Sequence, residues 1–405
     1  MEVYNTRTSR KEELMTKVAG IVKAYVCGPT VYDYSHIGHA RTYVNFDVLR
    51  RYLEATGYEV IHIQNFTDIE EKISDRAREL GMSPKALSQG YITEYFKDMD
   101  ALNVKRATRY PLASEYIPRI IEITGRLLES GQAYVAGEVI YFDVQSAGGF
   151  GELVKNLEDS LADKVTIKGT GKRNPFDFVL WRSAKEGEEG WESPWGTGRP
   201  GWHTECVAMS IDNLGTTLDV HWGGKDLIFP HHECEALIAR ALTGAQFVKY
   251  WMHNEFVLLK GEKMSKSTGR TVLIREVLKD HSPEALRVLI LSKHYRQKVE
   301  YDERAISEAG ERYRRLGEAA RRAKVNGWER GMSGCVKEYA NLFFGALDDD
   351  LETGQALAVM DRLSNEILAH DGHDGFEGAS KLYDAVEGVL GIRLHRDEDQ
   401  SMSTQ

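Results

Sequence analysis

Hydrophobic and polar positions near the start of the chain follow the pattern of a strand, a loop and a helix. An apolar run at residues 25–27 is followed by a Gly-Pro turn, and residues 38–56 then repeat apolar positions with the period of a helix. A second apolar run at 60–63 follows a turn at Gly57. The pattern predicts one β-α-β unit of a doubly wound sheet, in which ligands bind at the carboxyl ends of the strands.

The pattern of the remaining chain changes twice. Short apolar runs at 133–135 and 139–142, a glycine-rich turn and a charged stretch indicate a segment inserted between residues 131 and 200. Strands at 217–221 and 256–259 are expected to resume the α/β pattern. Beyond about residue 305 we expect a bundle of amphipathic helices. The expected helices are 67–81, 83–102, 113–131, 306–323, 337–347, 354–369 and 379–390.

Composition and charge narrow the class of protein. The chain has 405 residues, 42% hydrophobic and 28% charged, which fits a globular protein of several units. It has no run of eighteen apolar residues and its start does not resemble a secretion signal, so we expect no membrane span and a cytoplasmic location. Four cysteines are too few for a disulfide framework. A net charge of -10 argues against non-specific coating of nucleic acid.

Two motifs suit the binding of a polyphosphate. In the sequence SHIGHAR, His36 and His39 share one face at the start of a helix, and Gly38 lets a ligand approach the backbone. The N–H groups and positive dipole end of that helix suit phosphate. Far downstream, in GEKMSKSTG, Lys263 and Lys266 form a cationic loop able to clamp a polyphosphate. Together the two motifs resemble the HIGH and KMSKS signatures of class I aminoacyl-tRNA synthetases.

A third group of residues has the spacing of metal ligands. Cys27 ends the first strand and Cys206 lies in GWHTEC. His231 and Glu235 lie four apart in PHHECE, so they share one face of a helix. Two thiolates, one imidazole and one carboxylate can form a tetrahedral zinc site. Within the same segment His232 and Cys234 are competing candidates, and a structural zinc or plain buried cysteines are the alternatives.

Five segments carry a closer resemblance, to cysteinyl-tRNA synthetase. They are YVCGPTVYD (25–33), NFTDIEEKI (65–73), RNPFDFVLW (173–181), SPWGTGRP (193–200) and YWMHN (250–254). The resemblance runs from Tyr4 to about Leu390 and is shared with an offshoot, the mycothiol-pathway ligase that joins cysteine to an amino sugar. It implies that Cys27, Cys206, His231 and Glu235 hold one zinc ion.

The resemblance also implies substrates and further site residues. ATP with Mg²⁺, L-cysteine and tRNA(Cys) would be bound, by a protein that we expect to be a monomer. His36 and His39 would contact the phosphates of ATP, and Lys263 and Lys266 would close over the pyrophosphate. Thr67 and Trp202 would line the amino-acid pocket. Other positions expected to bind substrate or ATP are Gly28, Thr30, Gly38, His203, Gly223, Gly224, Asp226, Met264, Ser265 and Ser267.

The implied fold is the Rossmann-type α/β fold of class I synthetases, a doubly wound parallel sheet with an inserted subdomain, followed by a helical bundle. The catalytic domain would be formed by residues 1–130 and 201–260, and the inserted connective subdomain by 131–200. The KMSKS loop and stem-contact region would take 261–305. We expect the bundle over 306–393 and a disordered tail over 394–405.

Several positions depart from the family pattern. Trp222 and Lys225 stand where a glycine and a small polar residue are usual, Glu255 where glycine is common, and Cys234 and Arg270 where asparagine is usual. The chain also ends before the anticodon-reading domain that typical cysteinyl-tRNA synthetases carry, so we expect tRNA recognition to depend on the acceptor end. Three readings stay open: a cysteine–tRNA ligase, a ligase joining cysteine to a small amine, and a non-catalytic paralogue that binds cysteine or RNA.

Overall fold

The centre of the molecule is a four-stranded parallel sheet in the order β10-β9-β3-β4. It is seen in a computed structural model that describes residues 1–154, 171–263, 271–328, 331–370 and 375–395. The expected doubly wound sheet is therefore confirmed. Its strands are β3 (Ile21–Val26), β4 (Glu59–Gln64), β9 (Leu218–Gly224) and β10 (Val248–Asn254).

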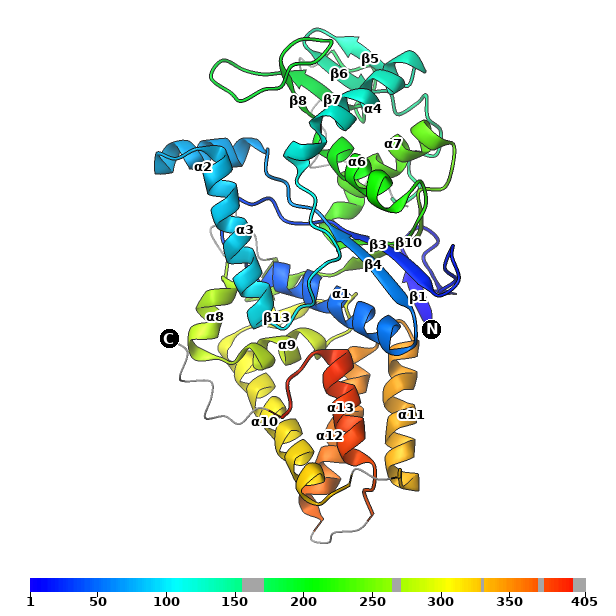
Figure 1. Cartoon of the computed structure of the whole chain (residues 1–405), viewed down its shortest axis with the longest axis vertical. Coiled ribbons are helices and arrows are strands. Elements are labelled where there is room, and N and C mark those ends of the chain that lie inside the picture. The colour runs from blue at the N-terminus through cyan, green and yellow to red at the C-terminus, as the bar shows by residue number, and fades with distance from the viewer. Residues whose placement is uncertain (155–170, 264–270, 329–330, 371–374, 396–405) are drawn as a thin grey trace.

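The order of the strands creates a crevice at one edge of the sheet. From β3 the chain passes through α1 (Ile37–Ala55) to β4 on one side, whereas β9 and β10 extend the sheet on the other side. The order thus reverses between β3 and β9, which is where ligands bind in such sheets. Helix α1 covers one face, and α6 (Trp202–Leu214) and α7 (Glu233–Thr243) cover the opposite face (Figure 1).

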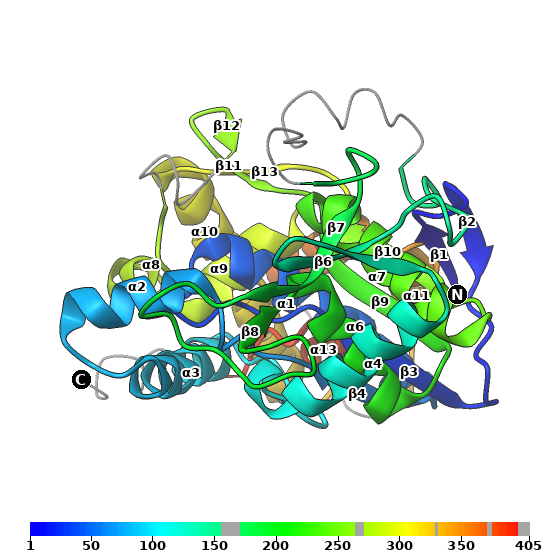
Figure 2. The ribbon, with the colours of Figure 1, turned by 90° about the horizontal axis from the view of Figure 1, so that it is seen from above.

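The chain between β4 and β9 forms a second, antiparallel sheet in the order β5-β6-β7-β8. Strands β5 (Ala133–Ala136) and β6 (Val139–Phe142) confirm the two expected strands. They are joined by β7 (Phe178–Ser183) and β8 (Gly198–Pro200), which the sequence pattern did not predict. Figure 2 shows this sheet beside α4 (Ile117–Glu129) and above the parallel sheet.

The C-terminal part consists of four helices, whose bounds agree closely with those of the predicted bundle. They are α10 (Glu303–Val325), α11 (Gly334–Asp348), α12 (Thr353–Ala369) and α13 (Ala379–Leu390). Polar side chains define their starts: Asp302 accepts a hydrogen bond from the Ala305 N–H at 2.7 Å, and Ser333 from the Val336 N–H at 3.4 Å. The bundle lies at the end of the molecule opposite the β5–β8 sheet (Figure 1). Leu394 is buried, and residues 396–405 lie outside the described residues.

A buried ion-pair network fixes α1 to the helices below it. The Arg287 side chain, on α9 (Pro283–Leu291), is 1% exposed and pairs with Asp47 of α1. Its guanidinium also donates to the carbonyl of Leu102 at 2.9 Å and to that of Leu390 at 2.5 Å, at the end of α13. Asp47 accepts a further bond from Arg51 at 2.7 Å. The helix that begins at His36 is therefore held against the bundle at its far end.

One expected helix begins later than predicted, and one expected strand lies in a different sheet. Residues 67–70 are not helical: Thr67 forms a parallel bridge with Thr30, and α2 (Glu71–Leu80) begins four residues later. The second expected late strand, 256–259, is not a sheet partner of β9. Strand β10 takes that place, and β11 (Val257–Leu259) belongs to a separate sheet. A strand that is buried on both faces lacks the alternation that marks a half-buried one, which is why β10 escaped detection.

The remaining elements complete the chain around this frame. They are β1 (Glu2–Asn5), β2 (Arg10–Glu13), α3 (Pro84–Ala101), η1 (Ala113–Tyr116), η2 (Lys225–Leu227), η3 (Ile228–His232), β12 (Glu262–Lys263), α8 (Ile274–Asp280) and β13 (Val299–Tyr301). Within the described ranges, every helix is too short or too polar to span a lipid bilayer.

Candidate active site

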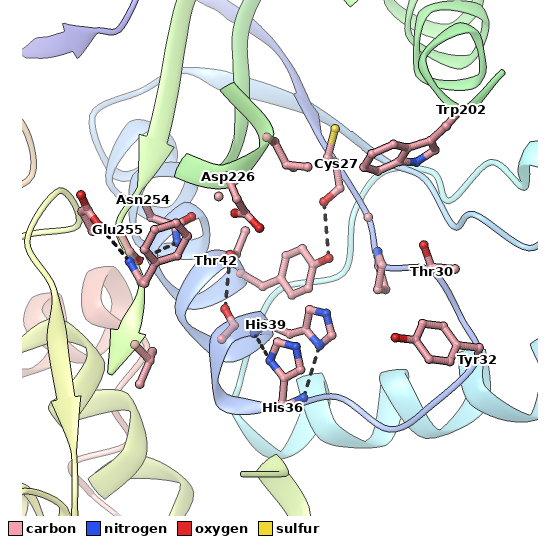
Figure 3. A pocket seen from close by; sticks show the side chains of 18 of the residues that line it. Cys27, Thr30, Tyr32, His36, His39, Thr42, Trp202, Asp226, Asn254 and Glu255 are labelled. Carbon is pink, nitrogen blue, oxygen red and sulfur yellow. Dashed lines mark hydrogen bonds between the residues drawn. The ribbon is translucent and has the colours of Figure 1, made fainter. Parts of the chain in front are cut away.

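A cavity of about 480 Å³ lies at the carboxyl ends of β3, β9 and β10, where the strand order reverses. Figure 3 shows three walls. Trp202 lies on one side, Asp226 and Glu255 lie on the opposite side, and His36 and His39 stand between them at the start of α1. A pocket at this place in a doubly wound sheet is the expected ligand site. The three walls differ in chemistry and are described in turn.

The start of α1 forms the middle wall. The ring of His36 accepts a hydrogen bond from the His39 backbone N–H at 3.3 Å, and the ring of His39 accepts one from the His36 N–H at 3.2 Å. The two rings stack with their centroids 3.8 Å apart, and both line the cavity together with Gly38. The expectation that the two histidines share a face is confirmed. Their rings lie at the positive end of the helix, where an anion is stabilised.

The segments on either side of the lysine-rich loop adjoin this wall. After the loop, Leu273 forms an antiparallel bridge with His36. Before it, β12 pairs with β11, whose Val257 lines the cavity. The described residues on either side of the loop are therefore paired with segments that line the cavity. The predicted residues Met264, Ser265, Lys266 and Ser267 lie outside the described residues, and only the backbone of Lys263 is described, as the end of β12.

The four predicted metal ligands come together behind the cavity. Cys27 follows β3, Cys206 lies on α6, and His231 and Glu235 lie on the continuous turn of η3 and α7. Their ligand atoms all lie within 4.8 Å of one another, and all four residues are buried. His231 Nε2 lies 2.9 Å from a Glu235 carboxylate oxygen, as the i, i+4 spacing predicted. Of the four, Cys27 also lines the cavity.

A second set of possible ligands overlaps the first. Cys27 and Glu235 also lie within 4.8 Å of ring nitrogens of His221 and His232. His232 Nε2 is 3.3 Å from Cys27 Sγ, and His221 Nε2 is 2.9 Å from the other Glu235 oxygen. His232 was a competing candidate in the sequence, whereas His221 was not considered. Among the described residues Cys234 belongs to neither set.

The charges of the two sets differ when no ion is bound. A hydrogen bond from Cys27 lowers the pKa of the Cys206 thiol to about 6, which favours the thiolate that a metal needs. Burial opposes charge on His231, but Glu235 and Cys206 outweigh it and raise the pKa of that imidazole to about 10. Burial likewise opposes charge on Glu235, yet His221 and His231 bring its pKa down to about 2. In contrast, burial and the neighbouring histidines lower the pKa of His232 well below its usual value.

The donor atoms of the first set fit zinc. Cysteine sulfur, histidine nitrogen and glutamate oxygen all bind this ion, and four such atoms suffice for a tetrahedral site. One of the four ligand residues, Cys27, also reaches the cavity wall, so the site borders the cavity. The pattern of donors thus matches a metal site that faces a substrate pocket.

The wall next to the cysteines is aromatic. The Trp202 ring stacks on His231 at 3.9 Å between centroids and is 41% exposed, so its other face is open to a ligand. His203 Nδ1 lies 2.9 Å from His231 Nδ1, and burial together with the charge of His231 lowers the pKa of His203 to about 3. His203 is thus a neutral ring that contacts His231. Thr67 is buried and, like His203 and Gly223, does not line the cavity. The positions predicted to bind substrate or ATP that do line it are Gly28, Thr30, Gly38, Trp202, Gly224 and Asp226.

Two glycines explain why the backbone can approach closely here. A Cβ on Gly28 would lie 1.5 Å from the Asn65 carbonyl oxygen, and the Gly28 N–H donates to Asn65 Oδ1 at 2.9 Å. A Cβ on Gly223 would lie 2.7 Å from the His232 ring. Both positions therefore require glycine. Asn65, which follows β4 as Cys27 follows β3, was missed, although its place at the end of a strand was a usable signal.

The wall opposite Trp202 is formed after β9 and β10. Gly224, Asp226, Asn254 and Glu255 line the cavity there. Two of the unusual residues pair with each other, since Lys225 forms an ion pair with Glu255. The third, Trp222, is fully buried and packs against Phe46 and Tyr295 with ring centroids 5.9 and 5.1 Å apart. It fills the core beneath the wall and leaves the cavity open.

The sequence matches one family along most of its length. Residues 14–311 match the family described as tRNA synthetases class I (C) catalytic domain. Two relatives named cysteine–tRNA ligase illustrate the similarity. The protein of Desulforudis audaxviator is 44% identical over 97% of this chain and 86% of its own length. That of Pyrococcus furiosus is 48% identical over 91% of this chain and 80% of its own length.

Solved structures of class I synthetases share the fold. Mycobacterium tuberculosis methionyl-tRNA synthetase in complex with methionyl-adenylate aligns with a TM-score of 0.64 at 14% identity, over 92% of this chain and 90% of that one. The ternary complex of Agrobacterium radiobacter LeuRS with tRNA and LeuAMS aligns with a TM-score of 0.70 at 12% identity, over 94% and 84%. At these identities the likeness concerns the fold.

Proposed function

This chain belongs to the class I (C) family of tRNA synthetases, and from that premise we propose that it is a cysteine–tRNA ligase. It activates cysteine with ATP and transfers it to the 3′ end of tRNA(Cys). The observation that carries the proposal is the position of Cys27. This residue belongs to a soft-ligand set with Cys206, His231 and Glu235 and also lines the cavity that begins at His36 and His39. A thiol bound at the metal would therefore lie within the phosphate-binding cavity.

We propose that Cys27, Cys206, His231 and Glu235 hold zinc. When bound, zinc supplies a soft Lewis acid that prefers a thiolate to a hydroxyl, because a hydroxyl loses its proton far less easily. Without it, a pocket of ordinary contacts separates near-isosteres such as cysteine and serine only about a hundredfold. Trp202, stacked on His231, forms the side of this pocket.

The middle wall handles the phosphates. In the first step the carboxylate of cysteine attacks the α-phosphorus of ATP and pyrophosphate leaves, with Mg²⁺ accompanying the nucleotide. The stacked rings of His36 and His39 hold the phosphates at the positive end of α1, where developing charge is stabilised. Lys263 and Lys266 of the adjoining loop close over the pyrophosphate. In the second step the 3′-terminal hydroxyl of tRNA attacks the activated carbonyl and AMP leaves.

The other predicted positions keep the roles that they had in the sequence. Gly28, Thr30 and Thr67 shape the amino-acid end with His203, and Gly223, Gly224 and Asp226 shape the nucleoside end. The unit boundaries proposed at 130, 200, 260, 305 and 393 stay predictions, and the one at 260 falls between β11 and β12, which pair in one sheet. We propose that the protein acts in the cytoplasm, where tRNA is used.

Cysteine-dependent exchange of labelled pyrophosphate into ATP tests the first step. The zinc-loaded protein should catalyse exchange with cysteine and far less with serine, and chelation followed by addition of zinc should abolish and restore it. Exchange that persists at full rate in metal-free protein would contradict the metal proposal. If no amino acid supported exchange, the proposal that this protein is an amino-acid-activating enzyme would be contradicted. Supplying tRNA and an amino sugar in parallel then separates the two acceptor classes.

A further inference from the structure

An ion pair closes the wall opposite Trp202. Lys225 follows β9 and Glu255 follows β10, and the parallel register pairs Gly224 with Asn254. The register therefore places the two following residues side by side, and their side chains meet. The Glu255 side chain is 10% exposed, whereas that of Lys225 is 53% exposed. The carboxylate is thus the buried partner, and the ammonium reaches it from the rim.

The backbone holds Glu255 in place from three directions. Its N–H donates to the Tyr295 carbonyl at 2.8 Å, and its carbonyl accepts from Arg41 Nε at 3.1 Å. Its second carboxylate oxygen accepts from the Phe256 N–H at 3.3 Å. The backbone of Glu255 is therefore fixed, and its carboxylate is held by Lys225 and by the Phe256 N–H. The Glu255 carboxylate thus places a fixed negative charge on this wall of the cavity. Asp226, a second carboxylate, lines the same wall.

The position of this wall assigns it to the nucleoside. The amino-acid end lies at Cys27 and Trp202, and the phosphates meet His36 at the start of α1, so the third wall is left for the base and ribose (Figure 3). A polyanionic ligand would be repelled by two carboxylates there. Removing one partner of a buried ion pair leaves the other charge uncompensated. The free energy lost is then larger than the net contribution of the pair itself.

We propose that Lys225 is a positioning residue that acts as the counterion of Glu255 and so lowers the repulsion that the phosphates of a nucleotide bound in this cavity would meet from this wall. Arg41 contributes positive charge from behind, but its guanidinium donates to backbone carbonyls, among them those of Ile290 at 2.9 Å and His294 at 3.0 Å. Among the described side chains, Lys225 is the cation that meets the carboxylate itself. The inference rests on the proposed function, in which the cavity binds ATP.

Calorimetric titration of the zinc-loaded protein with ATP, AMP and adenosine tests the role of Lys225. Lys225→Met should weaken ATP binding roughly tenfold, AMP binding less, and adenosine binding by under about twofold, because repulsion grows with ligand charge. Glu255→Gln should bind ATP at least as well as the wild type, and the double variant should recover most of the affinity. The control is Lys105→Met, which removes the same charge from a pair with Glu54 at the C-terminal end of α1, away from the cavity.

Two results would overturn the inference. If Lys225→Met weakened adenosine as much as ATP, the pair would shape the wall and its charge would be irrelevant. If the double variant bound ATP as weakly as Lys225→Met, Lys225 would contact the phosphates directly. Pyrophosphate exchange by the wild type reports separately on the proposed function, since a protein that binds ATP without activating cysteine still permits the comparison of ligands. A wild type that binds no ATP would overturn both.

Discussion

Replacement of Cys206 and of Cys234 by serine gives a matched pair of perturbations. Both cysteines are buried, at 1% and 3% exposure, and both substitutions exchange one sulfur for a smaller oxygen. Only Cys206 places its sulfur within 4.8 Å of the ligand atoms of Cys27, His231 and Glu235. The two variants therefore share the cost of a buried hydroxyl and differ in the loss of a ligand.

The expected magnitude follows from the number of ligands. Structural zinc sites bind with about 10–16 kcal/mol over four ligands, so loss of one thiolate is worth about 3–4 kcal/mol, or roughly 10²–10³-fold in zinc affinity. Cys206→Ser should lower zinc affinity by that factor and should therefore lose most of its cysteine activation. Cys234→Ser should keep its zinc and lose about 1–3 kcal/mol of folding stability if the new hydroxyl finds no partner.

Competition against a chromophoric chelator measures zinc affinity, and pyrophosphate exchange measures activation. Zinc affinity that fell equally in both variants would refute the reasoning, since the effect would then come from packing. The overlapping set makes a second contrast available. If Cys206→Ser kept its zinc while His232→Ala lost it, the ion would be held by Cys27, His221, His232 and Glu235 instead.

Three further predictions concern other parts of the molecule. His39→Ala should lower the rate of cysteine activation by roughly 10²–10³ with little change in the cysteine KM, as pyrophosphate-exchange kinetics would show, because its ring stands at the phosphate wall and outside the metal set. Zinc affinity, measured by chelator competition, should fall as the pH is lowered, because the pKa of His231 near 10 makes protons compete with the ion. Asp47→Asn should cost about 3–5 kcal/mol at neutral pH in urea unfolding. Burial opposes charge on Asp47, but Arg287 and Arg51 outweigh it and lower its pKa, so this contribution is present above about pH 4 and fades as the pH falls further.

The fold could be predicted where periodicity is strong. The four C-terminal helices expose one polar face along their whole length, and their positions in the sequence agree with α10 to α13 within a few residues. Strand β10 could not be predicted, because Val248–Asn254 is buried on both faces apart from Lys249 and shows no alternation. The helix expected over 67–81 begins only at Glu71, because Thr67 pairs with Thr30 beyond the end of β4. That contact lies between segments distant in sequence.

The sequence predicted most residues of the candidate site, but fewer of the contacts between them. The i, i+4 spacing of His231 and Glu235 fixes their contact, since any helical turn brings them together. The choice between His231 and His232 could not be made from spacing, because both lie within reach of Cys27 or Glu235. The pair of Lys225 and Glu255 was invisible because it depends on the register of β9 against the undetected β10. Once that register is known, their contact follows.

Transfer of labelled cysteine to tRNA tests the central claim most directly. Zinc-loaded protein, ATP, [³⁵S]cysteine and a pool containing tRNA(Cys) should yield label that precipitates with the tRNA, resists reducing agents and is released by mild alkali, as an ester is. Label should not appear when serine replaces cysteine as the labelled amino acid. A protein that activates cysteine but leaves every tRNA uncharged, while it joins cysteine to an amino sugar, would contradict the claim.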